Sequence, residues 1–437
     1  MAVLTEKKLL YTVAFLDLFA CSLIVPVLAP YLRSLGASHF TIGSLMSLYF
    51  GLQLISSPVI KNCSGAKSRL FILQTTLLAC SVFYFILGTT SVLPVVFLCR
   101  ALLGMFKHTQ TLCGSMLAEV LPPAEQLEMQ KTLTSFGTFG FVAGPAIAGN
   151  MLELHRGYQR VCYIITVIFL INFAIVYIFL QNSAHERRNE EGDNAMKLKT
   201  SSPNVKSKKN MESMSSIRKA KEHDIRRKRV SEEILQSVTD LLCINWTFYW
   251  DVFALKFLFD FTQTVHLMNF APVLRDVYNT APRWIGYTVA LQGMVGTMSS
   301  FLIEWISIFY KYDTNYTQRG LHGFGLFALS FLCLSLAPNW TYMFIFLLPL
   351  SMSMSLLKSA TAEMMRQRTV LDKKMPITGL GQSVFSAARL FAPVCTGLIY
   401  DMYGFQGTSV LKIVAAGIAT ALSYFIFLRQ VQDKKKM

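Results

Sequence analysis

Long apolar stretches, separated by short polar segments, dominate the pattern along the chain. A helix needs about 20 apolar residues to cross the hydrocarbon core of a bilayer. Twelve stretches meet this length, and all predict helices because an open sheet cannot satisfy its backbone groups in lipid. The predicted spans are 9–31, 40–60, 70–90, 92–116, 131–153, 160–181, 252–274, 284–308, 320–337, 339–358, 376–400 and 407–428.

Composition agrees with a membrane protein. Of the 437 residues, 53% are apolar and only 15% are charged. Soluble domains have about a quarter of their residues charged, which argues against a soluble enzyme. Seven of the nine cysteines fall in predicted spans and two in inward loops, so no disulfide is expected.

One long polar segment interrupts the apolar pattern. Residues 182–247 hold 14 Lys and Arg side chains among Ser, Asn and Glu, which predicts a disordered linker. The chain therefore divides into an N-terminal six-helix half at 1–181, the basic linker at 182–247, and a C-terminal six-helix half at 248–437.

The distribution of basic residues predicts the orientation in the membrane. With the N-terminus inside, the inward segments other than the linker hold 17 Lys and Arg, and the outward ones hold 6, Lys412 included. This bias predicts that both termini and the linker are cytoplasmic. The net charge of +16 then needs no nucleic-acid partner, because a basic linker is attracted to the anionic lipid of the inner leaflet.

The two predicted halves resemble each other at a nearly constant offset. Four short matches recur in the same order, separated by 242 to 248 residues. They are Ala29-Pro30 with Ala271-Pro272, Ile42-Gly43 with Ile285-Gly286, Ala118-Glu119 with Ala362-Glu363, and Pro145…Gly149 with Pro393…Gly397. Parallel six-helix repeats are the architecture of one class of secondary transporter, whose substrate site lies between the halves near the bilayer midplane.

The fifth and fourth spans carry motifs that identify a family resemblance. Small residues that allow close helix packing flank a proline in the fifth span, at Gly140, Gly144, Pro145 and Gly149. The fourth span contains Arg100-Ala-Leu-Leu-Gly104. Together these resemble the antiporter and R-x-x-x-G motifs of the major facilitator superfamily.

The resemblance covers essentially the whole chain except the linker. The eleventh span, with Pro393 and Gly397, is similar to the tetracycline-resistance-like and drug:proton antiporter branches. The resemblance implies an all-α membrane protein with twelve transmembrane helices in two pseudo-symmetric halves. It also implies a monomer that moves a small solute by alternating access. The six small and proline residues at 140, 144, 145, 149, 393 and 397 are then gating or packing residues.

The loop between the second and third spans departs from the family pattern. Gly65 stands where the family has an aspartate, which the resemblance implies would brace the N-terminus of the eleventh span. Arg69 is retained, opposite Glu119 at the end of the fourth span, and this pair is a second gating candidate. Loss of the aspartate predicts either impaired transport or a balance of states shifted inward.

Ionisable residues inside spans are costly, and so they are candidates for the substrate or proton pathway. Arg389 lies deepest, about 20 Å along its span, and Asp17 and Asp260 are its candidate partners by depth. His266 is alternatively a neutral packing residue that is satisfied by Asn269 or Thr262. Lys256 is expected to reach the cytoplasmic surface. The pathway candidates are Asp17, Arg100, Lys107, His108, Asp260, His266 and Arg389.

No metal-ligand spacing, Walker motif or dinucleotide fingerprint occurs, so neither a metal nor a cofactor is expected. The driving force must then be a gradient, and titratable Asp and His favour protons. Two functions remain open: a proton-coupled transporter, and a transport-incompetent relative acting as a membrane scaffold or sensor. The branch resemblance suggests amphipathic, often cationic solutes, whereas the excess of basic residues within the spans suits an anion or zwitterion.

Overall fold

The computed structural model describes residues 2–61, 66–120, 125–180, 246–311, 313, 315–371 and 377–436. Within these ranges the chain is almost entirely helical. The first group of helices is α1 (Ala2–Ser34), α2 (His39–Lys61), α3 (Ala66–Thr89), α4 (Leu93–Phe106), α5 (Thr109–Val120), α6 (Gln126–Leu152) and α7 (Gly157–Ile175), extended by the π-helical turn η1 (Val176–Leu180).

The second group follows the predicted linker, of which residues 182–245 lie outside the described ranges. It comprises α10 (Trp246–Asp276), α11 (Pro282–Ile306), the 3₁₀ turn η2 (Ser307–Tyr310), α12 (Thr317–Ser335), α13 (Trp340–Leu371) and α14 (Ile377–Lys436). The last element turns back on itself at Gly404, whose φ of 64° is one that glycine adopts without strain. Its two arms correspond to the last two predicted spans.

Every predicted span coincides with a helix or a helix pair in the described residues, although many helices run further at the ends than their spans. The fourth span is wrong in one respect. Predicted as one helix over 92–116, it is interrupted at Lys107 and His108 between α4 and α5. By length and composition alone, six helices of the described chain are apolar enough to cross a membrane.

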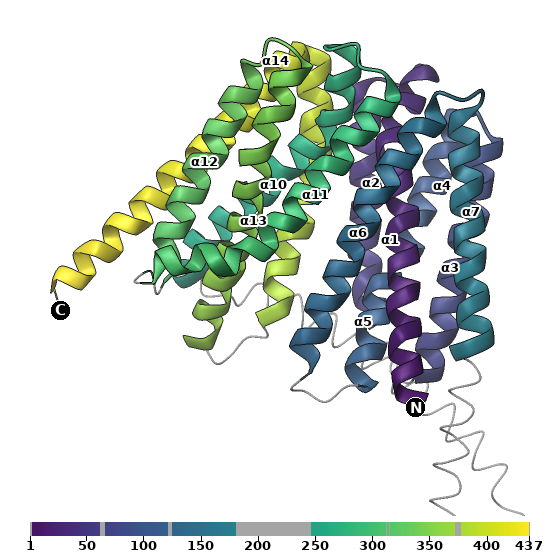
Figure 1. The fold of residues 1–437 in the computed structure, drawn as a ribbon, viewed down its shortest axis with the longest axis horizontal. Helices are drawn as coiled ribbons and strands as arrows, with labels where there is room; N and C mark the ends of the chain where they lie inside the picture. The colour runs from purple at the N-terminus through teal and green to yellow at the C-terminus, as the bar shows by residue number, and fades with distance from the viewer. Residues whose placement is uncertain are drawn as a thin grey trace, which may run out of the picture.

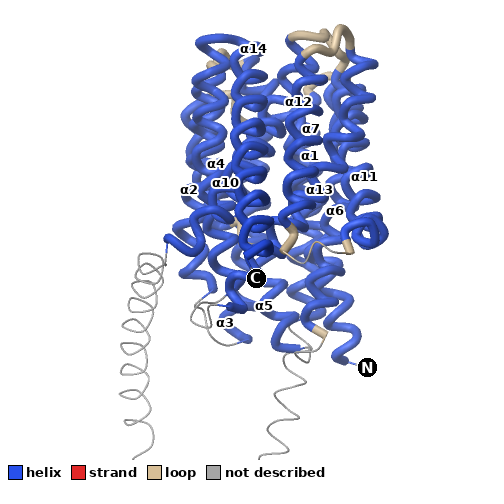
Figure 2. Tube along the Cα trace, turned by 90° about the vertical axis from the view of Figure 1, so that its left-hand side faces the viewer, coloured by secondary structure: helices blue, strands red, loops and turns tan. Residues whose placement is uncertain are grey.

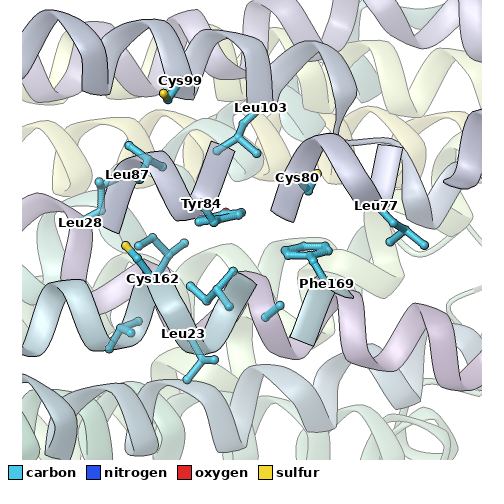
Figure 3. Close-up of a cluster of buried hydrophobic side chains, with 14 of the residues drawn as sticks. Leu23, Leu28, Leu77, Cys80, Tyr84, Leu87, Cys99, Leu103, Cys162 and Phe169 are labelled. Atoms are coloured by element: carbon cyan, nitrogen blue, oxygen red, sulfur yellow. The ribbon is translucent and has the colours of Figure 1, made fainter. Parts of the chain in front are cut away.

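The apolar core falls into two clusters, one for each group of helices. The first runs from Leu10 to Val176, and Figure 3 shows its centre, where Tyr84, Phe169 and their neighbours pack between helices. The second runs from Tyr249 to Ile426. The division into two halves at 181 and 248 stays a prediction, but each group buries its own apolar side chains.

The helices run side by side between two ends of the bundle (Figures 1 and 2). Both chain termini point towards one end, which we call the termini end. The turn within α14 and the turn between α6 and α7 lie at the opposite end, which we call the far end.

Among the described residues, the most extensive contacts between the groups are those of α2 with the first arm of α14 and of α6 with α11. A Cβ placed at Gly43 would overlap the carbonyl oxygen of Pro393, and one at Gly286 would overlap that of Pro145. The two seams are therefore built alike, with the glycine of one group against the helix proline of the other. Such close approach is what small residues permit in membrane helices.

Candidate functional site

A cavity of about 420 Å³ lies between the two groups of helices. Helices α1, α2, α3, α4 and α6 line it from the first group, and α10, α11 and the first arm of α14 from the second. Its size falls within the range of pockets that hold small organic molecules. Within the described residues, its lining contains four arginines, one histidine and one aspartate, Asp276.

Arg100, on α4, enters the cavity lining from the first group. Its side chain is 5% exposed, and its guanidinium carbon lies 4.7 Å from the ring centre of Tyr49. One Nη donates a weak, 3.7 Å hydrogen bond to the sulfur of Met46, while the buried Nε has no partner. The charge is thus held against an aromatic ring and a thioether.

Arg389, on the first arm of α14, lines the same cavity from the second group. Its guanidinium carbon lies 3.9 Å from the ring centre of Phe50 and 5.0 Å from that of Phe385. The predicted pairing of Arg389 with Asp17 or Asp260 is wrong, because each of these carboxylates forms an ion pair with a lysine instead. Sequence depth placed these carboxylates at a suitable level but could not show that nearer cations engage them.

Asp17 and Lys107 form a buried ion pair where α4 gives way to α5. Gln110 donates a 3.1 Å hydrogen bond to the same carboxylate, and Gln53 donates one of 2.8 Å to the carbonyl of Lys107. At the interruption, hydrogen bonds from side chains therefore take the place of backbone hydrogen bonds within the helix. Irregular backbone at membrane depth is tolerated where it is buried in protein in this way.

His108 occupies the second position of the interruption. Its Nε2 lies 2.7 Å from the hydroxyl of Ser56 on α2, and the side chain is buried. His108 thus joins α2 to the start of α5, near the Asp17–Lys107 pair but outside the cavity lining.

Asp260 pairs with Lys256 one turn away on α10, at 3.1 Å. Lys256 was expected to extend to the surface, and this is wrong, since its side chain is only 12% exposed. A lysine that finds a carboxylate within the protein has no need to reach water. Lys358, on α13, contributes further positive charge to this pair.

His266 is buried on α10 and forms a 3.0 Å hydrogen bond with Gln292 of α11. Neither Asn269 nor Thr262 is its partner, because Asn269 donates to the hydroxyl of Thr408 instead. Gln292 and Asn269 line the cavity, so His266 lies directly behind its wall.

Lys412 was assigned to the outward loops, and this is wrong. Its side chain is 8% exposed, and its ammonium lies 5.7 Å from the ring centre of Phe331. The signal was available in the sequence, because position 412 falls inside the predicted span 407–428.

The sequence analysis did not identify three residues of the cavity lining, Tyr49, Phe50 and Gln292. Aromatic and amide side chains at such spacing do not stand out in an apolar helix.

The predicted packing residues lie at two kinds of contact. Gly140 and Gly144 face α1, and a Cβ at Gly144 would overlap the hydroxyl of Ser22. Gly149 faces α11 across the seam, where its added Cβ would lie 2.7 Å from the carbonyl oxygen of Pro282. Pro393 and Gly397 occupy the matching seam against α2. The proposed pair of Arg69 with Glu119 remains a prediction, because the side chain of Glu119 lies outside those described.

Polar contacts join the two groups at the far end. The carboxylate of Asp401 accepts hydrogen bonds from the backbone N–H groups of His39 and Phe40, at 3.0 and 2.8 Å. Across the other seam, Arg283 lies 3.5 Å from Glu153. A carboxylate at a helix N-terminus is stabilised by unpaired N–H groups and the helix dipole.

An all-helical membrane bundle with a cavity between two similar groups defines a class of transport protein, and comparison with known proteins agrees. Residues 10–312 match the family model of the Major Facilitator Superfamily. This chain belongs to that superfamily.

Curated relatives match over part of their length. The chain is 27% identical over 204 residues to tetracycline resistance protein, class B, of Escherichia coli, which covers 45% of this chain and 50% of that protein. It is 26% identical over 174 residues to multidrug resistance protein MdtG of Salmonella typhi, covering 39% and 43%. The chain thus spans about half the length of these relatives, or less.

Solved structures match over nearly the whole chain. A bacterial homologue of the human lysosomal transporter Spinster, in an inward-facing and unoccupied conformation, superposes with a TM-score of 0.68 at 13% identity, covering 97% of this chain and 96% of that one. The nucleoside transporter NupG superposes with a TM-score of 0.65 at 13% identity, covering 97% and 98%. At such identities the likeness establishes the fold alone.

Proposed function

We propose that this chain is a secondary transporter that moves a small organic solute across a membrane by alternating access, coupled to protons. The observation that carries the proposal is the cavity of about 420 Å³ lined by both groups of helices, whose two seams carry polar contacts between the groups at the far end. A site between two bodies that can rock is what alternating access requires. Membership of the superfamily supports the same function.

Asp260 is the proposed proton site. Lys256 donates a 3.1 Å hydrogen bond to Oδ1 of Asp260, whereas Oδ2, also within ion-pair distance of the ammonium, accepts no hydrogen bond. The carboxylate of Asp17, by contrast, accepts from both Lys107 and Gln110. A proton arriving at Asp260 would release Lys256, and this change beside the cavity could bias the two states. The less satisfied carboxylate is the one expected to titrate during transport.

The test uses the full chain in proteoliposomes, with a broad panel of labelled solutes and an imposed pH gradient. We expect gradient-driven accumulation of at least one solute, above that in protein-free vesicles. Asp260→Asn should abolish accumulation while exchange of solute across the membrane continues. The double variant Lys256→Met with Asp260→Asn controls for leaving the lysine unpaired. Accumulation by Asp260→Asn equal to that of the unchanged protein would exclude the proton role.

A second function, a scaffold or sensor without transport, is favoured by one observation, namely Gly65 in place of the family's aspartate. Complete absence of exchange for every solute, in protein that is folded and correctly inserted, would favour it.

The proposed orientation places both termini and the 182–247 linker in the cytoplasm. Epitope tags at either terminus and beside Ser202 should be reached by antibody only after permeabilisation of cells. A tag near position 202 that is accessible on intact cells would reverse the orientation.

A further inference from the structure

Two arginines from opposite groups of helices enter one cavity without a carboxylate partner. Among the described residues, neither Arg100 nor Arg389 has an oxygen of Asp or Glu within ion-pair distance. Each guanidinium is instead held against an aromatic ring, Tyr49 for Arg100 and Phe50 for Arg389. Leaving a buried charge without a counter-charge is costly, so paired or functional cations are the rule at membrane depth.

The nearby carboxylates are already engaged. Asp17 is held by Lys107, Asp260 is held by Lys256, and neither lines the cavity. The aspartate in the lining, Asp276, is the last residue of α10, at the far end. The deeper part of the described lining therefore carries two positive charges and no carboxylate.

The remaining lining suits an apolar body. Tyr84, Phe141 and Phe385 contribute rings, while Gln263, Asn269 and Gln292 contribute amides from the second group. A guanidinium presents a planar set of donors that matches carboxylate, sulfonate and phosphate groups. A cavity of about 420 Å³ holds a small organic molecule with one such group.

We infer that the substrate is an amphipathic organic anion, an oxyanion carried on an aromatic or aliphatic body, held between Arg100 and Arg389. This inference rests on the proposed transport function and specifies its substrate class. It departs from the cationic solutes that sequence resemblance suggested. Because the two arginines belong to different groups of helices, an anion between them would also draw the two groups together.

A matched set of naphthalene probes separates charge from shape. Binding of 2-naphthoate, neutral 2-naphthamide and the cation 2-naphthylmethylammonium is measured by thermal stabilisation of the purified full chain. The carboxylate is expected to bind about tenfold or more tightly than either analogue. Arg100→Gln and Arg389→Gln should each remove that preference, because truncating one partner of a buried charge pair is costly.

Arg366→Gln is the matched control, because that exposed arginine pairs with Glu363 on its own helix, away from the cavity. It should bind naphthoate normally. If Arg100→Gln elutes as aggregated protein, Arg100→Lys and Arg389→Gln are tested in its place. The lysine keeps the positive charge but lacks the planar set of donors of the guanidinium. Equal or tighter binding of the cation would overturn the inference. So would naphthoate binding that persists in Arg389→Gln, or binding of inorganic phosphate without any preference for the organic anion.

Counterflow of radiolabelled 2-naphthoate in proteoliposomes distinguishes this inference from the transport function. Exchange of the anion supports both the transport function and the anionic substrate. Anion binding without exchange of any solute would refute transport and leave a ligand-binding protein. Exchange of cationic solutes alone would keep transport and refute the anionic substrate.

Discussion

The two ends of the bundle differ in how a carboxylate is used between the two groups of helices. At the far end, Asp401 follows the eleventh span and accepts from the first backbone N–H groups of α2. At the termini end, the family resemblance implies an aspartate that would brace the start of the eleventh span. The chain has Gly65 there, which lies outside the described residues.

The difference indicates how such a protein sets its balance of states. A carboxylate at a helix N-terminus is worth about 0.3–1 kcal/mol when exposed. This contribution is present at the far end and is missing from the sequence at the other end. We therefore expect the resting protein to favour the state in which the far end is closed.

The largest effect is expected at the seam where α6 meets α11. Gly286→Ala places a Cβ against the carbonyl oxygen of Pro145, and the backbone must move to accept it. Overpacking of this kind costs about 1–3 kcal/mol. Solute exchange should fall at least tenfold, and the melting temperature should fall by several degrees, as measured in detergent by tryptophan fluorescence.

Gly296→Ala, on the same helix, is the control, because a Cβ there meets nothing within 4 Å. It should leave exchange unchanged and leave stability unchanged or slightly raised, by up to about 1 kcal/mol from helix propensity. Equal losses in both variants would show that any alanine in α11 is harmful and that the seam is not specific.

The next effect concerns Asp401 itself. Asp401→Asn keeps an acceptor but loses the negative charge at the start of α2. The population with an open far end should rise about two- to fivefold, which corresponds to the dipole energy above. Cys21 lines the cavity, and the other cysteines are replaced for this experiment. The readout is the rate at which Cys21 reacts with an impermeant maleimide added on the far side of the membrane.

Glu363→Gln is the matched control, since Glu363 is engaged by Arg366 on its own helix. Its labelling rate should match that of the unchanged protein. A slower rate in Asp401→Asn would mean that the contact holds the far end open.

The smallest effect is expected from restoring the missing carboxylate. Gly65→Asp should raise far-side labelling of Cys21 by up to about fivefold, by favouring closure of the termini end. Gly65→Asn tests whether charge is needed and should give a smaller rise. No change in either variant would show that the loop does not influence the balance.

The sequence predicted the fold more completely than the site. Apolar spans about 20 residues long require helices, and the glycine–proline motif indicated close contacts of the kind found at Gly144 and Gly149. The interruption at Lys107 was not predictable, because it depends on Asp17 and Gln53 from other helices. The predicted ion-pair partners of Arg389 were wrong for the same reason, since depth along a span does not give the direction of a side chain.

The most direct test of alternating access is a pair of distance measurements by double electron–electron resonance. Labels at Ser34 and Val277 report on the far end, and labels at Lys8 and Trp250 report on the termini end, all in one cysteine-free background in nanodiscs. At rest we predict a narrow, short distribution at the far end and a longer, broader one at the termini end. A change of pH together with solute should lengthen the first and shorten the second. Distances that stay fixed at both ends under every condition, or lengthen together, would contradict alternating access.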